Sequence, residues 1–385
     1  MKHKKVYIIP VTSGDVIKFK GNNSNFYDIG NSNGTFRNSE IRFDVSGNIL
    51  SLLNEDLYPY LDAIPNYSSY NQSYAYDNAD LYVNGENTFF ELFYNTNVVN
   101  AKDLILPTYT TGSCFYRMFI GCKQLITTPS FDNVKMSSYC CRSMFANCTS
   151  LVTPPALPAT TLENGCYNEM FSNCTSLTTM PILPATTVPK YAYQNMFQSC
   201  TSLTTTTPMR ISVDSYACKQ MFSKCKNLVN ASNIEIYNHE NATGTVFNNY
   251  ACQSMFEYCE YLTQPPILSA PNIVGSCYDS MFYNCIELQT APDLPAIKPM
   301  PKSYRKMFQG CKKLNYIKCL ATDLSSLNCL QYWTGSTNFQ HGNTTSSDSN
   351  TTKGVANSGT FVKVSGVNYS IDTSGIPNGW TIQNI

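Results

Sequence analysis

Charge is scarce in this chain of 385 residues, because Lys, Arg, Asp and Glu together make up only 14% of it. The 26 basic residues balance the 26 acidic ones, so the basic excess typical of nucleic-acid-binding proteins is missing. We therefore expect no nucleic-acid partner. The polar surface must come mainly from Asn, Ser, Thr and the 27 Tyr, and the 43% of apolar residues suffice for a substantial core.

Long apolar runs are also missing. No stretch approaches the ~20 apolar residues that a membrane helix needs, so we expect no membrane insertion. The apolar run from Val6 to Val11 is interrupted by Pro10 and is followed by polar residues, which makes it a poor signal-peptide core. We interpret it as a strand, and the sequence predicts no export by an ordinary N-terminal signal.

Catalytic signatures are lacking as well. The three histidines, His3, His239 and His341, lie in unrelated segments, and the GxSxG, GxxxxGK[ST] and HExxH patterns are absent. Acidic residues do not recur as a facing pair, although folding could still assemble a glycosidase pair. The sequence predicts no catalytic residues, no metal and no cofactor. A non-enzymatic protein is therefore favoured, with a glycan-cleaving enzyme as the weakest alternative.

What the chain has instead is an internal repeat. A Met-Phe pair recurs eight times, at a spacing of 26 residues except for one step of 25 and one of 34. Every copy carries Cys four residues after its Met and Leu seven residues after it. A period of this length is typical of a solenoid, in which each rung buries its apolar residues against its neighbours. The eight pairs begin at Met118, Met144, Met170, Met196, Met221, Met255, Met281 and Met307.

The stretch CYNEMFSNC, residues 166–174, shows the structure expected of each rung. A small residue lies four positions before each Met and Cys lies four after it, which is near the spacing of one helix face. We expect a helix of two to three turns, then a short strand that starts at the Leu and ends at prolines such as Pro181. The predicted fold class is an α+β repeat solenoid of leucine-rich-repeat type, with one short helix and one short strand per rung of about 26 residues.

The repeat divides the chain into three parts. Residues 89–333 form the predicted solenoid, with a degenerate first rung at Leu92-Phe93, where Thr96 replaces the Cys, and a degenerate last rung at Trp333. Residues 1–88 lack the period and alternate in strand fashion, which predicts a β-rich N-terminal domain. Residues 334–385 predict an exposed loop and a β-rich C-terminal cap, with Trp380 packed on the last rung.

The 17 cysteines begin at Cys114 and follow the repeat. A buried thiol is a compact side chain that suits a stacked column, so we favour a ladder of reduced cysteines. No CxxC pair occurs, which argues against a zinc site. Some disulfides and a metal site stay open as less favoured alternatives.

The unit CYxxMFxxCxSLxxxPxLPATT resembles the BspA-like leucine-rich repeats of Bacteroides-type gut bacteria and their bacteriophages, most closely over residues 114–208. Residues 358–385 also resemble the tail that follows such repeats. The resemblance implies a surface, adhesion or host-interaction protein rather than an enzyme.

Bacterial members of this family are normally exported, whereas a virion protein needs no export signal. We therefore expect a bacteriophage virion protein, a tail or head fibre-like component assembled in the host cytoplasm. The alternative is a bacterial surface adhesin located at the cell surface. The expected partners are a host cell-surface glycan or protein and other virion proteins, and a homo-oligomer is left open.

The longest step of the repeat, from Met221 to Met255, marks the predicted ligand site. Its extra residues fall within 234–249, and insertions in solenoids emerge as loops that often lie on the binding face. Tyr237, His239 and Phe247 are the ligand-binding candidates, and a tolerated surface insertion is the alternative. The varied strand positions of each rung are a second candidate surface. A neutral surface rich in Tyr and Asn suits carbohydrate.

Overall fold

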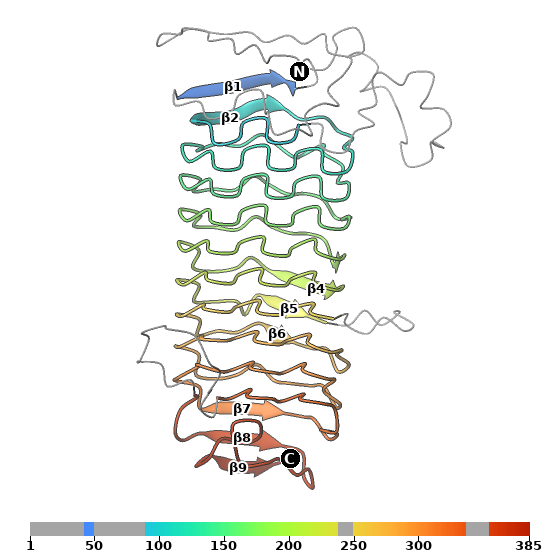
Figure 1. Cartoon of the computed structure of the whole chain (residues 1–385), viewed down its shortest axis with the longest axis vertical. Coiled ribbons are helices and arrows are strands. Elements are labelled where there is room, and N and C mark those ends of the chain that lie inside the picture. The colour runs from blue at the N-terminus through green and yellow to red at the C-terminus, as the bar shows by residue number, and fades with distance from the viewer. Residues whose placement is uncertain (1–41, 50–88, 238–248, 336–353) are drawn as a thin grey trace, which may run out of the picture.

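The computed structural model describes residues 42–49, 89–237, 249–335 and 354–385. These residues form a solenoid whose rungs stack along one axis, from β1 and β2 at one end to β9 at the other (Figure 1). In each rung, a segment of successive turns forms one side of the stack and an extended segment returns the chain for the next rung (Figure 1). The predicted repeat solenoid is therefore confirmed.

All strand pairs named in the described residues are parallel, as stacked rungs require. Three sheets result, with the orders β1-β2, β3-β4-β5-β6 and β7-β8-β9. Isolated bridges between neighbouring rungs, such as Thr290 with Tyr316, extend the same ladder between the sheets. The strands are β1 (Phe43–Asn48), β2 (Val98–Ile105), β3 (Thr187–Val188), β4 (Met209–Val213), β5 (Ile234–Ile236), β6 (Ile267–Leu268), β7 (Tyr316–Cys319), β8 (Thr360–Lys363) and β9 (Thr381–Asn384).

The predicted helix in each rung is wrong. Over the described ranges the chain contains no α-helix, and no helix that is long and apolar enough to cross a membrane. The segment around each Met is instead a run of tight turns with a true period of four residues. In the rung of Met170, the residues with left-handed φ are Gly165 at 62°, Glu169 at 57° and Asn173 at 60°. Each reverses the chain, so pairs of residues between them point into the core.

Hydrogen bonding explains why turns replace the helix. Alternate backbone N–H groups donate within the rung, as from Met170 to the carbonyl of Tyr167 at 3.1 Å. The N–H groups between them donate to the next rung, as from Phe171 to the carbonyl of Met196 at 2.9 Å. A helix would use all its N–H groups internally and would leave neighbouring rungs unconnected. The turns satisfy the buried backbone and join the rungs at the same time.

Stacked side-chain columns form the core. Nine phenylalanines, one per rung from Phe93 to Phe308, stack with ring centroids 5.0–5.8 Å apart and planes within 5–17° of parallel. The Met, the Cys and the Leu of every rung are fully buried. Neighbouring copies of one position therefore contact each other along the axis.

The cysteine column has a role beyond filling space. The thiol of Cys174 donates to the carbonyl oxygen of Phe145 in the preceding rung at 3.1 Å. All eight cysteines of this column make the equivalent bond, at 2.9–3.2 Å. In the first rung Thr96 replaces the cysteine, and its hydroxyl donates to the carbonyl of Phe93. A small donor is thus required at this position, which Ala or Leu would not supply.

The two ends are closed differently. At the N-terminal end β1 pairs with β2 of the first rung. At the C-terminal end Trp333 occupies the Met position of the repeat, its ring lies tilted against Phe308, and its indole N–H donates to the carbonyl of Gly375 at 2.7 Å. Trp380 is also buried and donates to the carbonyl of Ala356.

We expect the thiols to be reduced and unreactive while the protein is folded. All 17 cysteines are buried and none forms a disulfide, and burial raises the pKa of Cys122 to about 11 and that of Cys174 to about 12. Because the thiolate is the reactive form, the eight column thiols should resist alkylation at pH near 8 and react on unfolding. Mass spectrometry after alkylation in denaturant, without reductant, should show 17 labels. Recovery of stable intramolecular disulfides would contradict the ladder.

Candidate recognition surface

The insertion residues are only partly placed. Tyr237 follows β5, and its N–H donates to the carbonyl of Ile211 at 3.0 Å. The guanidinium carbon of Arg210 lies 3.9 Å from the centroid of the Tyr237 ring, so one ring face is already covered. His239 and Phe247 lie outside the described residues. The predicted site of these three residues therefore stays a prediction.

Sequence reasoning missed a group of residues on the turn side of the rungs. Tyr191, Tyr216 and Tyr250 occupy the same position in three successive rungs and form a tyrosine ladder. Both centroid separations are 5.1 Å, and the rings are partly buried. The amine of Lys190 lies 5.0 Å from the Tyr191 ring centroid, and that of Lys219 lies 5.5 Å from Tyr216.

The backbone at these positions makes tyrosine a costly choice. Tyr191, Tyr216 and Tyr250 have φ of 64°, 58° and 63°, and Tyr258 has 60°. The left-handed region costs a residue with a side chain roughly 1–2 kcal/mol, and bulky residues are rare there. Gly165 occupies the equivalent position in another rung, so the fold itself does not require an aromatic ring. The left-handed conformation recurs at this corner in other rungs with Ser, Lys or Gly, so the choice of side chain, and not the backbone, distinguishes the ladder.

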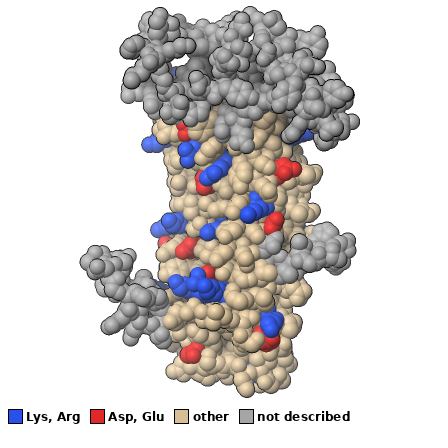
Figure 2. All heavy atoms as spheres, turned by 45° about the vertical axis from the view of Figure 1, so that its right-hand side comes forward, with Lys and Arg blue, Asp and Glu red and all other residues tan. Residues whose placement is uncertain are grey.

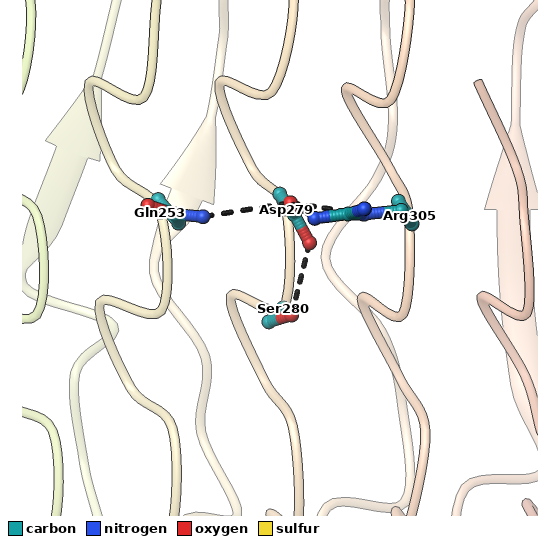
Figure 3. A network of polar contacts seen from close by, with 4 residues as sticks. All are labelled: Gln253, Asp279, Ser280 and Arg305. Carbon is teal, nitrogen blue, oxygen red and sulfur yellow. Dashed lines mark hydrogen bonds and ion pairs between the residues drawn. The ribbon is translucent and has the colours of Figure 1, made fainter. Parts of the chain in front are cut away.

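A buried carboxylate network lies in the turn segments of the last rung of the ladder and of the two rungs that follow it (Figure 3). Asp279 is completely buried, and its Oδ2 accepts hydrogen bonds from Arg305 Nη2 at 2.5 Å and Nε at 3.1 Å. Gln253 donates to the same oxygen from the preceding rung at 3.5 Å, and Ser280 donates to Oδ1 at 2.9 Å. We call these four residues the Asp279 network. They span three neighbouring rungs and hold the carboxylate rigidly.

Glu257 connects the network to the ladder. Burial raises the pKa of Glu257 above its usual value, and the negative charge of Asp279 adds to this effect. Hydrogen bonds with Ser254 and Gln220 and the positive charge of Lys224 act in the opposite direction. Gln220 directly follows Lys219 of the ladder in sequence. The tyrosine ladder, the Asp279 network and Glu257 with its partners all lie in the turn segments of successive rungs. We call them together the turn-face patch, in which Asp279 itself is fully buried.

Elsewhere, ion pairs act mainly between neighbouring rungs. Lys226 pairs with Glu260 at 3.2 Å and Lys313 with Glu287 at 2.5 Å, both at partly exposed positions. Exposed pairs of this kind contribute about 0–1 kcal/mol. Figure 2 shows a face on which the few basic and acidic side chains lie in small mixed groups. The surface in this view carries no large region of one charge.

The opposite side of the solenoid carries a shallow apolar hollow of about 440 Å³. Residues 153–158 and 179–184 of two successive rungs line it. Met180 is buried, whereas Ile182 is 70% exposed, so only part of the predicted variable strand face reaches solvent. The hollow offers few polar groups, which are mainly the hydroxyls of Thr153 and Thr179. It can accept an apolar group but provides little to orient a ligand.

No metal centre is visible in the parts of the chain that the structure covers, because no group of three or more His, Cys, Asp or Glu has the required arrangement there. The carboxylates of Glu257 and Asp279 do not form a two-carboxylate hydrolytic site. The negative charge of Asp279 helps to raise the pKa of Glu257, but Asp279 is fully buried and is hydrogen-bonded to Arg305 and Ser280. A glycosidase needs two carboxylates that reach the glycosidic bond, and Asp279 does not.

Comparison with known proteins gives little beyond the fold type. No family model matches the chain, and no curated protein matches it. Among solved structures, a leucine-rich repeat protein from Bacteroides ovatus is 18% identical and aligns over 60% of this chain with a TM-score of 0.27. The chain covers 64% of the length of that protein. The neighbour's description agrees with the repeat type that the sequence resembles, but at this score it carries no argument about function.

The raised pKa of Glu257 predicts a pH effect on stability. A carboxyl group whose pKa is higher in the folded state stabilises the fold below its unfolded pKa, and this contribution is lost as pH rises through the folded value. In the wild type, the free energy of unfolding should therefore decrease as the pH rises from near 4.5, the usual pKa of Glu. We expect Glu257→Gln to remove this decrease. Denaturant titrations from acidic to neutral pH measure it. Glu163→Gln, at an exposed position, is the control, and identical pH profiles for wild type and Glu257→Gln would contradict the prediction.

Proposed function

We propose that this chain is a non-enzymatic recognition protein that attaches to a glycan on a cell surface through the turn-face patch. The observation that carries the proposal is the stacking of Tyr191, Tyr216 and Tyr250 at one left-handed position of successive rungs, where the fold requires the backbone conformation but not an aromatic ring. The amines of Lys190 and Lys219 lie over these rings. Tyrosine edges and hydroxyls, combined with amines, can bind the oxygen atoms of sugars.

The finer proposal is a bacteriophage virion protein, a tail or head fibre-like component for host attachment. Its support is the resemblance of the repeat unit to BspA-like repeats. A bacterial surface adhesin of the same repeat type is the second candidate. Gene neighbourhood distinguishes the two, since capsid and tail genes would favour the first and outer-membrane genes the second.

The proposed attachment is tested by binding of the purified protein, clustered on beads, to Bacteroides-type cells or their capsular polysaccharide. Clustering is needed because single sites for neutral sugars are weak and many copies multiply them. Binding should depend little on salt, since the chain has no net charge. We expect Tyr216→Asn combined with Tyr250→Asn to reduce binding at least about tenfold. Asn tolerates the left-handed backbone, so the melting temperature should change little.

A matched control is available in the same column. Tyr139 also has left-handed φ, at 55°, but its ring lies against Gly165 and outside the ladder. Tyr139→Asn should leave binding intact. The predicted insertion site has its own test, the pair Tyr237→Ala and Phe247→Ala. Loss of binding in this pair, with the ladder variants unaffected, would transfer the proposal to the insertion. Absence of binding to any cell or glycan would contradict the proposed attachment function.

A further inference from the structure

The ladder offers its ring edges rather than its ring faces. Tyr191 and Tyr216 lie at an interplanar angle of 34°, and Tyr216 and Tyr250 at 22°, so neighbouring rings cover each other's faces. The amines of Lys190 and Lys219 cover parts of the same rings. Aromatic edges carry the positive part of the ring quadrupole. A ligand across the ladder therefore meets a row of weakly positive edges and two amines, which favours oxygen atoms.

The row repeats at the spacing of the rungs. Ring centroids are 5.1 Å apart in both steps. An extended peptide presents side chains to one face at intervals of about 6.6–6.8 Å, so it loses register with the ladder after one or two steps. A polynucleotide would need a basic excess, and this chain has none. One sugar unit of an extended, equatorially linked chain has nearly the length of the ~4.8 Å strand spacing.

Resting on the proposed function, we propose that the turn-face patch binds an extended, equatorially linked polysaccharide whose chain runs along the solenoid axis with one sugar unit facing each rung. Each rung of the ladder then contributes the same kind of contact to successive sugars. The partly exposed side chains of Gln253 and Arg305 lie in line along the axis on either side of the buried Asp279, and they extend the surface beyond the ladder (Figure 3).

The charges of the patch indicate that the polysaccharide is uncharged. Arg305 is paired with Asp279, and Lys224 interacts with Glu257. Lys190 and Lys219 remain as the two amines beside the ladder, and they can donate hydrogen bonds to hydroxyls. The chemistry that remains is hydrogen bonding to hydroxyls along the length of the chain. A site that recognises a single terminal sugar needs a closed cavity, whereas the ladder is an open row of tyrosine rings.

The experiment is a chain-length series, from monomer to hexamer, with β-1,4-linked oligomers of glucose, xylose, mannose and N-acetylglucosamine. α-1,4-linked glucose oligomers, which curl, are the matched control of equal composition. Calorimetry or glycan-surface binding should show, for at least one β-1,4 series, affinity that rises several-fold per added sugar until the ladder is spanned. The curled series should bind at least about tenfold more weakly at equal length.

Shortening the ladder provides the second measurement. Tyr250→Asn should reduce the affinity for long oligomers and leave that for dimers nearly unchanged, whereas Tyr139→Asn should change neither. Affinity independent of length, or equal for curled and extended chains, would overturn the axial mode. Binding of cell polysaccharide without binding of any β-1,4 oligomer would also overturn it, while leaving the proposed attachment standing. Competition by an extended peptide, with no sugar bound, would overturn both.

Discussion

Replacing Phe171 with Ala should destabilise the protein by about 3–5 kcal/mol, and replacing Leu177 with Ala by about 2–5 kcal/mol. Both side chains are fully buried. Phe171 stacks on Phe145 at 5.8 Å and on Phe197 at 5.6 Å, so its loss leaves a cavity between two rungs that the fixed backbone cannot close. Denaturant unfolding, followed by circular dichroism and tryptophan fluorescence, measures the change.

The control is Ile182→Ala, because Ile182 is an apolar residue of the same rung that is 70% exposed. It should change stability by less than about 0.5 kcal/mol. Repeat proteins lose cooperativity more easily than compact domains, so coincidence of the two signals must be checked before free energies are compared. Changes below about 1 kcal/mol at both Phe171 and Leu177 would contradict the core assignment.

Replacing Trp333 with Ala should have a comparable effect, about 3–5 kcal/mol, localised at the C-terminal end. Trp333 is completely buried and contacts Tyr304, Phe308 and Phe361. Its indole N–H also joins the last rung to the carbonyl of Gly375. The variant removes both the ring and the bond between the solenoid and the cap.

Hydrogen exchange distinguishes this local effect from a global one. Amides of residues 302–311 and of β7 and β8 should lose protection in Trp333→Ala, while those of residues 139–148 should change little. Trp333→Phe, which keeps a ring but lacks the donor, should show a smaller effect. Uniform loss of protection along the whole chain would mean that the cap does not stabilise the end rungs separately.

The sequence was sufficient for the register of the rungs but not for their local conformation. The Met, Cys and Leu columns are buried where the repeat places them, and Thr96 and Trp333 occupy the predicted end positions. The helix prediction failed because a period of four is close to 3.6 and the buried positions fit both. The discriminating signal was the recurrence of Gly or Asn three residues after the Met, as at Gly121, Asn147 and Asn173, which disfavours a helix.

The turn-face patch could not be recognised without the backbone. Tyr191, Tyr216 and Tyr250 are unremarkable as surface residues until their position is known to be left-handed. The Asp279–Arg305 pair was closer to being predictable, since opposite charges lie at the same repeat position of adjacent rungs. The insertion attracted attention because it breaks the period, yet Tyr237 is covered by Arg210 and its two companions lie outside the described residues.

The alternating hydrogen bonds of the turns have an evolutionary consequence. Each rung presents to its successor the same row of donors that its predecessor presents to it, as the pairs Phe145–Met170 and Phe171–Met196 show. A gene duplication or deletion of one whole unit therefore leaves no backbone group without a partner. Such lineages can lengthen or shorten the molecule by single units at little cost to folding. Selection can then act on the length of the solenoid surface, while the residues exposed on each copied unit diverge independently.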